Sequence, residues 1–255
     1  MSATLARIYR YPVKGMTAEA LASTALEPGK RVPGDRRFAI AHGGGISHEA
    51  SAAWQPKAGF LNLMRDERLA LLEARFDEAS GVLALNRGGK PLARGDLRTP
   101  LGRTLIEQFL AAFMKGELRG SPKLVEARAG AFTDQEAPFL SLVNLASVRD
   151  LGERVIKGEV DPLRFRANLY IDGLPPWREL DLIGGQIDFG AVRLRVAAPI
   201  RRCAAVNVDP ATAARDLNIP RALEGGIGHP SMGVYAEVMS AGVLAAGAAA
   251  VIPER

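Results

Sequence analysis

The fold class is decided by one stretch, Leu180-Asp-Leu-Ile-Gly-Gly-Gln-Ile-Asp-Phe-Gly-Ala-Val-Arg-Leu-Arg-Val196. Apolar residues alternate here with polar ones, and the alternation is interrupted at Gly184-Gly185 and again at Gly190. A period of two broken by glycine turns is typical of short antiparallel strands with one buried face. The stretch therefore predicts a β-rich, barrel-like core.

The residues that follow hold the only cysteine in the chain. Ala198-Pro-Ile-Arg-Arg-Cys-Ala-Ala-Val-Asn-Val-Asp-Pro210 places Cys203 directly after Arg201 and Arg202. Neighbouring guanidinium groups favour the thiolate, which is a strong nucleophile and a soft metal ligand. Free cysteine is also among the most buried residue types, so this stretch by itself fits a small buried hydrophobe better than a site.

Composition narrows the class of protein. The 255 residues are 47% hydrophobic and 24% charged, which predicts one or two closely packed globular domains without disordered segments. One cysteine excludes an intramolecular disulfide and any zinc or iron–sulfur site built from four cysteines of this chain. The net charge of +5 suits anionic ligands, but the arginines are scattered and not grouped with aromatic residues, so we do not expect nucleic-acid binding.

The two ends of the chain bear on location. Residues 1–4 lead directly into an alternating segment, without the basic and apolar regions of a secretory signal. The longest apolar run, Ala241–Ile252, is too short to span a bilayer. These features predict a cytoplasmic protein without a membrane span.

Basic residues recur at turns near strand ends in the first part of the chain. Leu5–Tyr11 alternates and predicts a strand, which Pro12 ends before the turn that carries Lys14. A second turn places Arg36 and Arg37 at the start of an apolar strand, Phe38–Ala41. Converging guanidinium groups can bind an anion, although ion pairing with Asp35 or another acid explains them equally.

The middle of the chain predicts a hairpin followed by a helix. Arg68–Phe76 and Gly81–Leu85 are apolar-rich runs separated by a polar turn. Thr99-Pro100 then offers an N-cap and a first-turn proline. The spacing of the apolar residues predicts a buried helix face formed by Leu101, Leu105, Phe109, Leu110 and Phe113.

Two further segments supply polar candidates. Pro138–Asn144 predicts a buried strand that precedes a helix starting at Ser147, and loops between strands and helices often contact ligands. Asn144 and Ser147 are therefore candidates, although helix capping alone explains Ser147. Arg164–Ile171 alternates and would place Arg164, Arg166 and Asn168 on one strand face, either as an oxyanion surface or as a solvated outer face.

Four segments occur in this order: Tyr11-Pro12-Val13-Lys14, Gly34-Asp35-Arg36-Arg37-Phe38, Phe165-Arg166-Ala167-Asn168, and Arg202-Cys203 followed by Val208-Asp209-Pro210. Together they resemble the MOSC family, the molybdenum cofactor sulfurase C-terminal domain, together with its N-terminal β-barrel partner. The subgroup they resemble is the amidoxime-reducing molybdenum proteins. The resemblance implies a β-rich α+β fold with a few short helices. It also implies an N-terminal MOSC-type β-barrel domain over residues 1–120, packed closely against a MOSC domain over residues 121–255.

The family resemblance also implies a molybdenum-cofactor site. Cys203 would be the metal ligand, and Asp209 a candidate proton relay, although capping before Pro210 explains Asp209 as well. Phosphate and an electron-rich dithiolene need fixed cations, and bidentate guanidinium suits phosphate. The sequence departs from the amidoxime reductases at Gly15-Met16, Ala167 and Arg201, which leaves the substrate open. The residues expected to bind the cofactor are Lys14, Arg36, Arg37, Asn144, Ser147, Arg166, Asn168, Arg201, Arg202 and Cys203.

The resemblance implies a molybdenum-cofactor oxidoreductase that reduces small N-hydroxylated or related N-oxygenated substrates. Because the chain shows no second redox centre, electrons would come from a separate flavin, haem or iron–sulfur protein. One alternative is a sulfur or cofactor carrier that uses Cys203 as a persulfide or transient ligand. Another is a cofactor-binding protein without catalysis.

Overall fold

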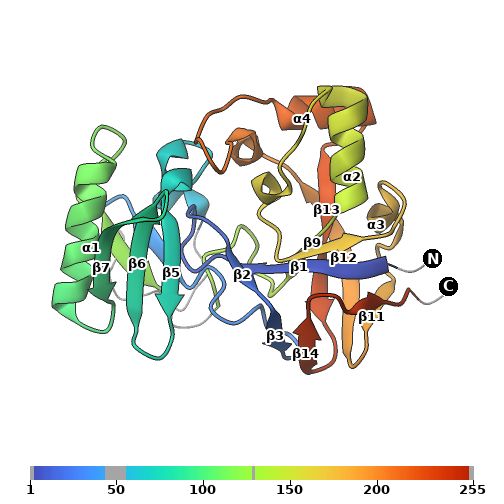
Figure 1. Ribbon diagram of the computed structural model, residues 1–255, viewed down its shortest axis with the longest axis horizontal. Helices are drawn as coiled ribbons and strands as arrows, with labels where there is room; N and C mark the ends of the chain where they lie inside the picture. The colour runs from blue at the N-terminus through green and yellow to red at the C-terminus, as the bar shows by residue number, and fades with distance from the viewer. Residues whose placement is uncertain (1–2, 44–55, 128–129, 253–255) are drawn as a thin grey trace.

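The computed structural model describes residues 3–43, 56–127 and 130–252. They form two lobes that lie side by side (Figure 1). One lobe carries the longest described helix, α1 (Pro100–Phe113), beside a three-stranded sheet. The other carries a large sheet covered by the short helices α2 (Leu145–Asp150), α3 (Arg178–Asp181) and α4 (Ile219–Ala222).

The larger lobe is built on an eight-stranded sheet of order β11-β12-β13-β9-β10-β1-β15, with β2 paired to β1. Asp188 of β11 and Val251, which follows β15, exchange backbone hydrogen bonds of 2.8 Å, so the sheet curls until its two edges meet. The prediction of a β-rich, barrel-like core is confirmed. The strands are β1 (Ala3–Arg10), β2 (Glu19–Leu21), β9 (Leu140–Asn144), β10 (Leu169–Asp172), β11 (Gln186–Phe189), β12 (Val192–Arg201), β13 (Ser231–Val238) and β15 (Ala249–Ala250).

The alternating sequence of β12 explains its place in the sheet. Val192, Leu194 and Val196 are buried in the main core, whereas Arg193 and Arg195 between them are exposed. Such a strand has one apolar face and one solvated face. Its last residue, Arg201, leads directly to Cys203 at the end of the sheet.

The start of the stretch Leu180–Val196 differs from the prediction because it is helical. Residues 178–181 form α3, in which Glu179 is fully buried and accepts a hydrogen bond of 2.8 Å from the hydroxyl of Ser147. The partner lies 32 residues earlier in the sequence. Local alternation carries no information about such a contact, so strand structure begins only at Gln186.

The smaller lobe confirms the predicted hairpin and the predicted helix start. Residues 67–71 form a turn of 3₁₀ helix before the hairpin strands. Thr99 caps α1 by accepting a hydrogen bond of 3.0 Å from the Gly102 amide. The strands of this lobe are β5 (Glu73–Asp77), β6 (Val82–Arg87) and β7 (Lys90–Asp96) in one antiparallel sheet, and β4 (Phe38–Ala41) paired with β8 (Lys123–Glu126).

The predicted buried face of α1 is wrong in the first half of the helix and correct in the second, where Leu110 is buried and Phe109 and Phe113 pack against the core. Gly102, Ile106 and Leu110 are buried, whereas Leu101 is 70% exposed and Leu105 is 45% exposed. Gly102 decides the orientation, because a side chain at this position would collide with the backbone of β7. The helix therefore turns its glycine, and not its leucine-rich side, toward the sheet.

Strand pairing crosses the expected domain boundary after residue 120. β1 belongs to the large sheet although it starts the chain, and β14 (Gly242–Ala245) pairs with β3 (Ser23–Leu26). Hydrogen bonds of the sheets thus link the two halves at both ends of the chain. The larger lobe thus includes strands from both halves of the sequence, and the site lies between the two lobes.

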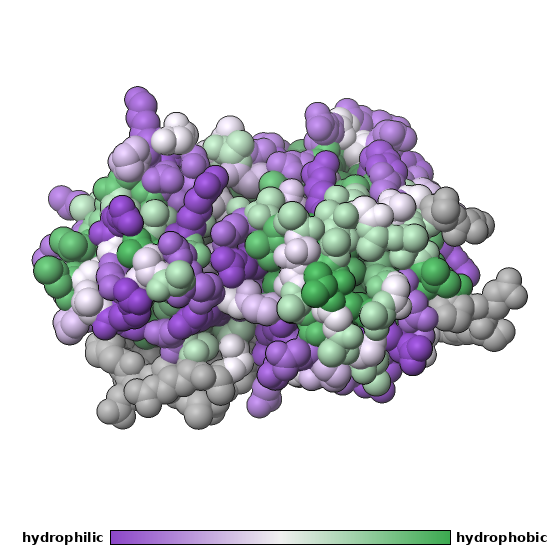
Figure 2. Space-filling view, turned by 60° about the horizontal axis from the view of Figure 1, so that its bottom comes forward, coloured by the Kyte–Doolittle hydropathy of each residue, from purple (hydrophilic) through white to green (hydrophobic). Residues whose placement is uncertain are grey.

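The surface differs between the two lobes. In the view of Figure 2, polar side chains cover much of one lobe, while apolar side chains gather on the other. Val243 and Val251 are among the most exposed large apolar residues, at 71% and 58%. Within the described ranges, no helix has both the length and the apolar character needed to cross a membrane.

Candidate functional site

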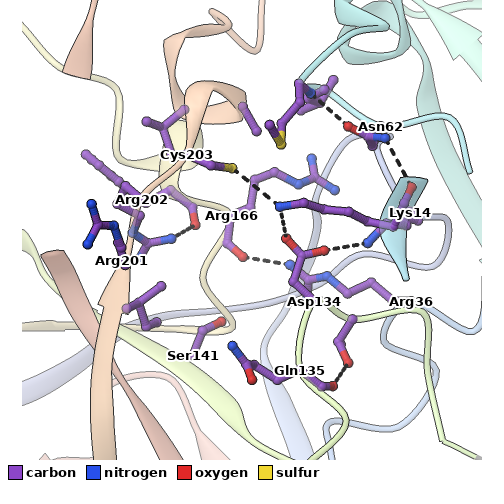
Figure 3. A pocket seen from close by; sticks show the side chains of 18 of the residues that line it. Lys14, Arg36, Asn62, Asp134, Gln135, Ser141, Arg166, Arg201, Arg202 and Cys203 are labelled. Carbon is purple, nitrogen blue, oxygen red and sulfur yellow. Dashed lines mark hydrogen bonds and ion pairs between the residues drawn. The ribbon is translucent and has the colours of Figure 1, made fainter. Parts of the chain in front are cut away.

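A cavity lies between the lobes where β12 ends. Cys203 is the N-cap of the short 3₁₀ helix Ala204–Asn207, and its sulfur points toward the space that the carboxylate of Asp134 also faces (Figure 3). Both halves of the chain contribute to the lining. Of the residues predicted for the site, the cavity brings together Lys14, Arg36, Arg166, Asn168, Arg201, Arg202 and Cys203.

Arg36 and Arg166 reach the cavity from a backbone conformation that side chains rarely adopt. Their φ angles are +48° and +51°, in the left-handed region. Arg166 follows the 3₁₀ turn Pro162–Phe165, and β10 begins only at Leu169. The prediction of one strand over Arg164–Ile171 is therefore wrong in its first half, and these side chains do not share a strand face. Strained backbone of this kind is found most often at functional sites.

The ring of Tyr11 holds both guanidinium groups in place. The guanidinium carbons of Arg36 and Arg166 lie 4.4 and 4.3 Å from its centre. Arg36 also donates hydrogen bonds to Asp35 (2.6 Å) and to the carbonyl of Arg166 (2.8 Å). Burial acts to lower the pKa of Arg36, but the attraction of Asp35 outweighs it and the pKa is raised.

Arg166 and Arg202 differ from Arg36 because no ion pair of the described residues includes them. Arg166 donates to the carbonyl of Met16 (2.7 Å), and Arg202 donates to the carbonyls of Phe165 (2.9 Å) and Met232 (2.8 Å). Burial without a neutralising carboxylate lowers the pKa of each to about 10. These two groups add positive charge to the cavity that the described part of the chain does not neutralise.

Lys14, Lys57 and Asp134 form a cluster beside the sulfur. Asp134 binds the ammonium of Lys14 at 2.8 Å and that of Lys57 at 3.2 Å. Burial acts to raise the pKa of Asp134, but the two lysines outweigh it and hold the pKa at about 2. Burial lowers the pKa of Lys14, whereas the attraction of Asp134 opposes burial at Lys57, whose pKa is raised. The Lys57 nitrogen lies 4.0 Å from the sulfur of Cys203.

The sequence analysis missed Lys57 and Asp134. Lys57 belongs to the long connection between the predicted strands that end at Ala41 and begin at Arg68. Connections of that length inside a compact domain are usually functional, and this signal could have drawn attention to the segment. Asp134 offers no comparable signal, because its role depends on partners 120 and 77 residues away.

Asn168 and Arg201 line the cavity in different ways. The Asn168 side chain is buried, accepts hydrogen bonds from the amide and hydroxyl of Ser141, and donates to the carbonyl of Tyr9. Its amide thus joins β9 to β1 behind the cavity. Arg201 has a side chain that is 76% exposed and pairs with Glu224 at 3.3 Å, so it lies at the rim.

Arg37 and Asp209 lie outside this cavity. Arg37 points to the opposite side from Arg36 and pairs with Glu126 (2.7 Å) and Glu78 (2.6 Å), so Arg36 is the arginine of this turn that faces the site. Asp209 pairs with Arg164 at 2.8 Å and accepts hydrogen bonds from the amides that follow Pro210. These contacts agree with the capping explanation of Asp209 and place its side chain away from the cavity.

Asn144 and Ser147 also lie away from the cavity, within the core of the larger lobe. Asn144 is the N-cap of α2, so the helix begins at Leu145 and not at Ser147. Both side chains donate to the buried carboxylate of Glu179, at 3.1 and 2.8 Å. Burial raises the pKa of Glu179, and these hydrogen bonds oppose that effect. Their role in the structure is to satisfy a buried acid.

The arrangement defines a class of site: a cationic cavity between two β-rich lobes, with a single thiol beside it. Such a site suits a ligand that combines anionic oxygens with an atom bound by sulfur. Among the residues that the structure describes, no group of three or more His, Cys, Asp or Glu side chains is arranged to hold a metal ion.

Family models match almost the whole chain. The MOSC N-terminal beta barrel domain matches residues 2–120, and the MOSC domain matches residues 129–251. The chain therefore belongs to the MOSC family and carries both domains. None of the curated proteins compared with the chain matches it.

The solved structures that match the chain share little sequence with it. The YuaD protein from Bacillus subtilis is 13% identical over 98% of this chain and 94% of its own, with a TM-score of 0.46. YiiM from Geobacillus stearothermophilus is 22% identical over 46% of this chain and 54% of its own, with a TM-score of 0.36. YiiM from Escherichia coli is 19% identical over the same shares, with a TM-score of 0.34.

Proposed function

We propose that the cavity binds the molybdenum cofactor and that Cys203 is the protein ligand of its metal. The observation that carries this proposal is the pair Arg166 and Arg202, whose charges meet no carboxylate among the described residues. Partly buried guanidinium groups are costly unless an anion neutralises them. Membership of the MOSC family agrees with a molybdenum cofactor as that anion.

The residues present fit such a group. The Nη2 atom of Arg166 is shielded from solvent and has no hydrogen-bond partner in the described part of the chain, which suits a phosphate oxygen. Lys14 and Arg36 add fixed positive charge, and the sulfur of Cys203 is a soft donor appropriate to molybdenum. When bound, the cofactor supplies two-electron redox chemistry at its metal. The protein supplies anchoring and orientation.

We further propose that the protein is an oxidoreductase that reduces N-hydroxylated or related N-oxygenated small molecules. One cysteine in 255 residues leaves no iron–sulfur cluster of four cysteines in this chain, which supports an electron donor on a separate flavin, haem or iron–sulfur protein. A reducing compartment keeps a cysteine as a free thiol that can bind a metal. This supports a cytoplasmic location.

A second candidate is a carrier of sulfur or cofactor, with Cys203 as persulfide or transient ligand. The observation in its favour is exposure: Cys203 is half-buried, and Arg201 beside it is at the surface. A partner protein could therefore approach the sulfur from the rim of the cavity.

The metal content of the purified protein separates the two. In a host that makes the cofactor, we expect near-stoichiometric molybdenum and pterin, lost in Cys203→Ala and reduced in Arg202→Met. Arg149→Met is the matched control, because this exposed arginine pairs with Asp172 outside the cavity. If the protein contains no metal and alkylation with mass spectrometry finds a persulfide on Cys203, the carrier function replaces the proposed enzyme function. Turnover of benzamidoxime with an artificial electron donor distinguishes an enzyme from a cofactor-binding protein without catalysis.

A further inference from the structure

We infer that the part of the cavity beside Cys203 is an anion-selective subsite and that Lys57 determines this selectivity. That this subsite binds the substrate rests on the proposed function. If it does, the substrate is a small molecule that carries a carboxylate or another oxyanion. The inference starts from position: the Lys57 ammonium is 4.0 Å from the sulfur. A small molecule in contact with the sulfur therefore lies close to this charge.

The segment that carries Lys57 is held in place by its own hydrogen bonds. Lys57 starts the 3₁₀ turn Lys57–Gly59. The Asn62 side chain donates to the carbonyls of Lys57 (3.3 Å) and Phe60 (2.8 Å). The backbone amide of Asn62 donates to the buried carboxylate of Asp66 (2.8 Å). Asn62 lines the cavity next to Lys14 (Figure 3). The charge is thus presented by an anchored turn.

The charges that line the cavity are unbalanced. Among the lining residues, Arg164, Arg36 and Arg201 have carboxylate partners of their own elsewhere. Among the described residues, the other lining cations share a single ion-pair partner. It is the carboxylate of Asp134, which binds both lysines. These remaining cations are Lys14, Lys57, Arg166 and Arg202. More positive charge is therefore present than the carboxylates of the described residues neutralise.

Lys57 differs from the other three cations in its surroundings. Lys14, Arg166 and Arg202 each donate to backbone carbonyls and are fixed in the cavity wall. Lys57 is 36% exposed and has the sulfur and Asp134 as neighbours. The wall cations suit a resident ligand, whereas Lys57 faces the space through which a second molecule reaches the thiol. It is the cation placed to select that molecule by charge.

Alkylation of Cys203 in protein made without cofactor measures this selectivity directly. Iodoacetate is anionic and iodoacetamide is neutral, and both attack the same thiolate. The ratio of their rates therefore cancels the thiolate fraction and reports the local positive potential. We expect the ratio of the iodoacetate rate to the iodoacetamide rate to be higher for Cys203 than for free cysteine. Lys57→Met should lower this ratio about fivefold or more. Lys57→Arg should preserve it.

Two further variants sharpen the test. Asp134→Asn removes the opposing carboxylate and should raise the ratio. Lys30→Met is the matched control, because this exposed lysine pairs with Glu27 and its loss changes the net charge equally. A ratio that does not change in Lys57→Met overturns the inference, and Lys57→Gln repeats the measurement if the methionine variant does not fold.

Molybdenum content of the same variants separates this inference from the proposed function. Lys57→Met should retain metal and pterin when made with cofactor, because the wall cations remain. Loss of metal in this variant would place Lys57 in the cofactor site and overturn the substrate subsite. If the unmodified protein itself contains no molybdenum, the proposed function fails, and the subsite then fails as a substrate site whatever the alkylation ratio.

Discussion

Replacing Asp134 by asparagine tests the charge cluster of the cavity through stability. The carboxylate has a pKa of about 2, against 3.8 for an unperturbed aspartate. That difference corresponds to about 2.4 kcal/mol, since a tenfold change in an equilibrium is worth about 1.4 kcal/mol. The side chain is 45% exposed, and solvent screening reduces the net effect to about 1 kcal/mol. We therefore expect Asp134→Asn to lower the free energy of unfolding by about 1 kcal/mol at pH 7.

The pH dependence of this loss has a definite sign. Because the pKa of Asp134 is lower in the folded state, its contribution is fully present above pH 3.8 and is lost as the pH falls toward 2. Urea unfolding of the cofactor-free protein at several pH values from 7 to 3 should show a constant difference between wild type and variant down to about pH 5. Below pH 4 the difference should shrink.

A surface control makes the result interpretable. Glu27 pairs with Lys30 three residues away, and both side chains are more than half exposed. Glu27→Gln should change the free energy of unfolding by less than about 0.5 kcal/mol. The reasoning is refuted if Asp134→Asn matches this control at pH 7, or if its effect is the same at pH 7 and pH 3.

Four further substitutions test the fold. Ile106→Ala should cost about 2–4 kcal/mol and Leu105→Ala less than about 0.5 kcal/mol in urea unfolding; equal losses would contradict the observed face of α1. Gly233 has a φ of +76°, and a side chain there would collide with the carbonyl of Leu142, so Gly233→Ala should lower the Tm by several degrees. Lys157 has a φ of +60°, so Lys157→Gly should raise the free energy of unfolding by about 1 kcal/mol. A drop in Tm would show that the left-handed backbone there is not strained.

Local signals in the sequence predicted most elements correctly. Thr99-Pro100 marked the start of α1, and alternation marked β12, because capping and strand faces depend on neighbours a few residues apart. The buried face of α1 was predicted wrongly in the first half of the helix, at Leu101 and Leu105, because hydrophobicity favours leucine and ignores a glycine that lets two backbones approach. Where a contact depends on the absence of a side chain, an apolar pattern points to the wrong face.

The segment around Arg166 shows a second limit. Its alternation predicted a strand, yet Asp161-Pro162 starts a 3₁₀ turn in which the Asp161 side chain accepts a hydrogen bond from the amide of Leu163. That cap and proline were readable in the sequence and were overlooked. The positive φ of Arg166 was not readable, because an arginine adopts it only where surrounding contacts enforce it.

By itself, the sequence determined the β-rich class, the family and the presence of a cysteine preceded by two arginines. The tertiary structure decided which cations face that cysteine: Arg36 but not Arg37, and Lys57, which no motif indicated. The physical reason is distance along the chain. The Lys57 ammonium and the Cys203 sulfur come from residues 146 positions apart. Only the packing of the two lobes against each other brings such side chains into one cavity.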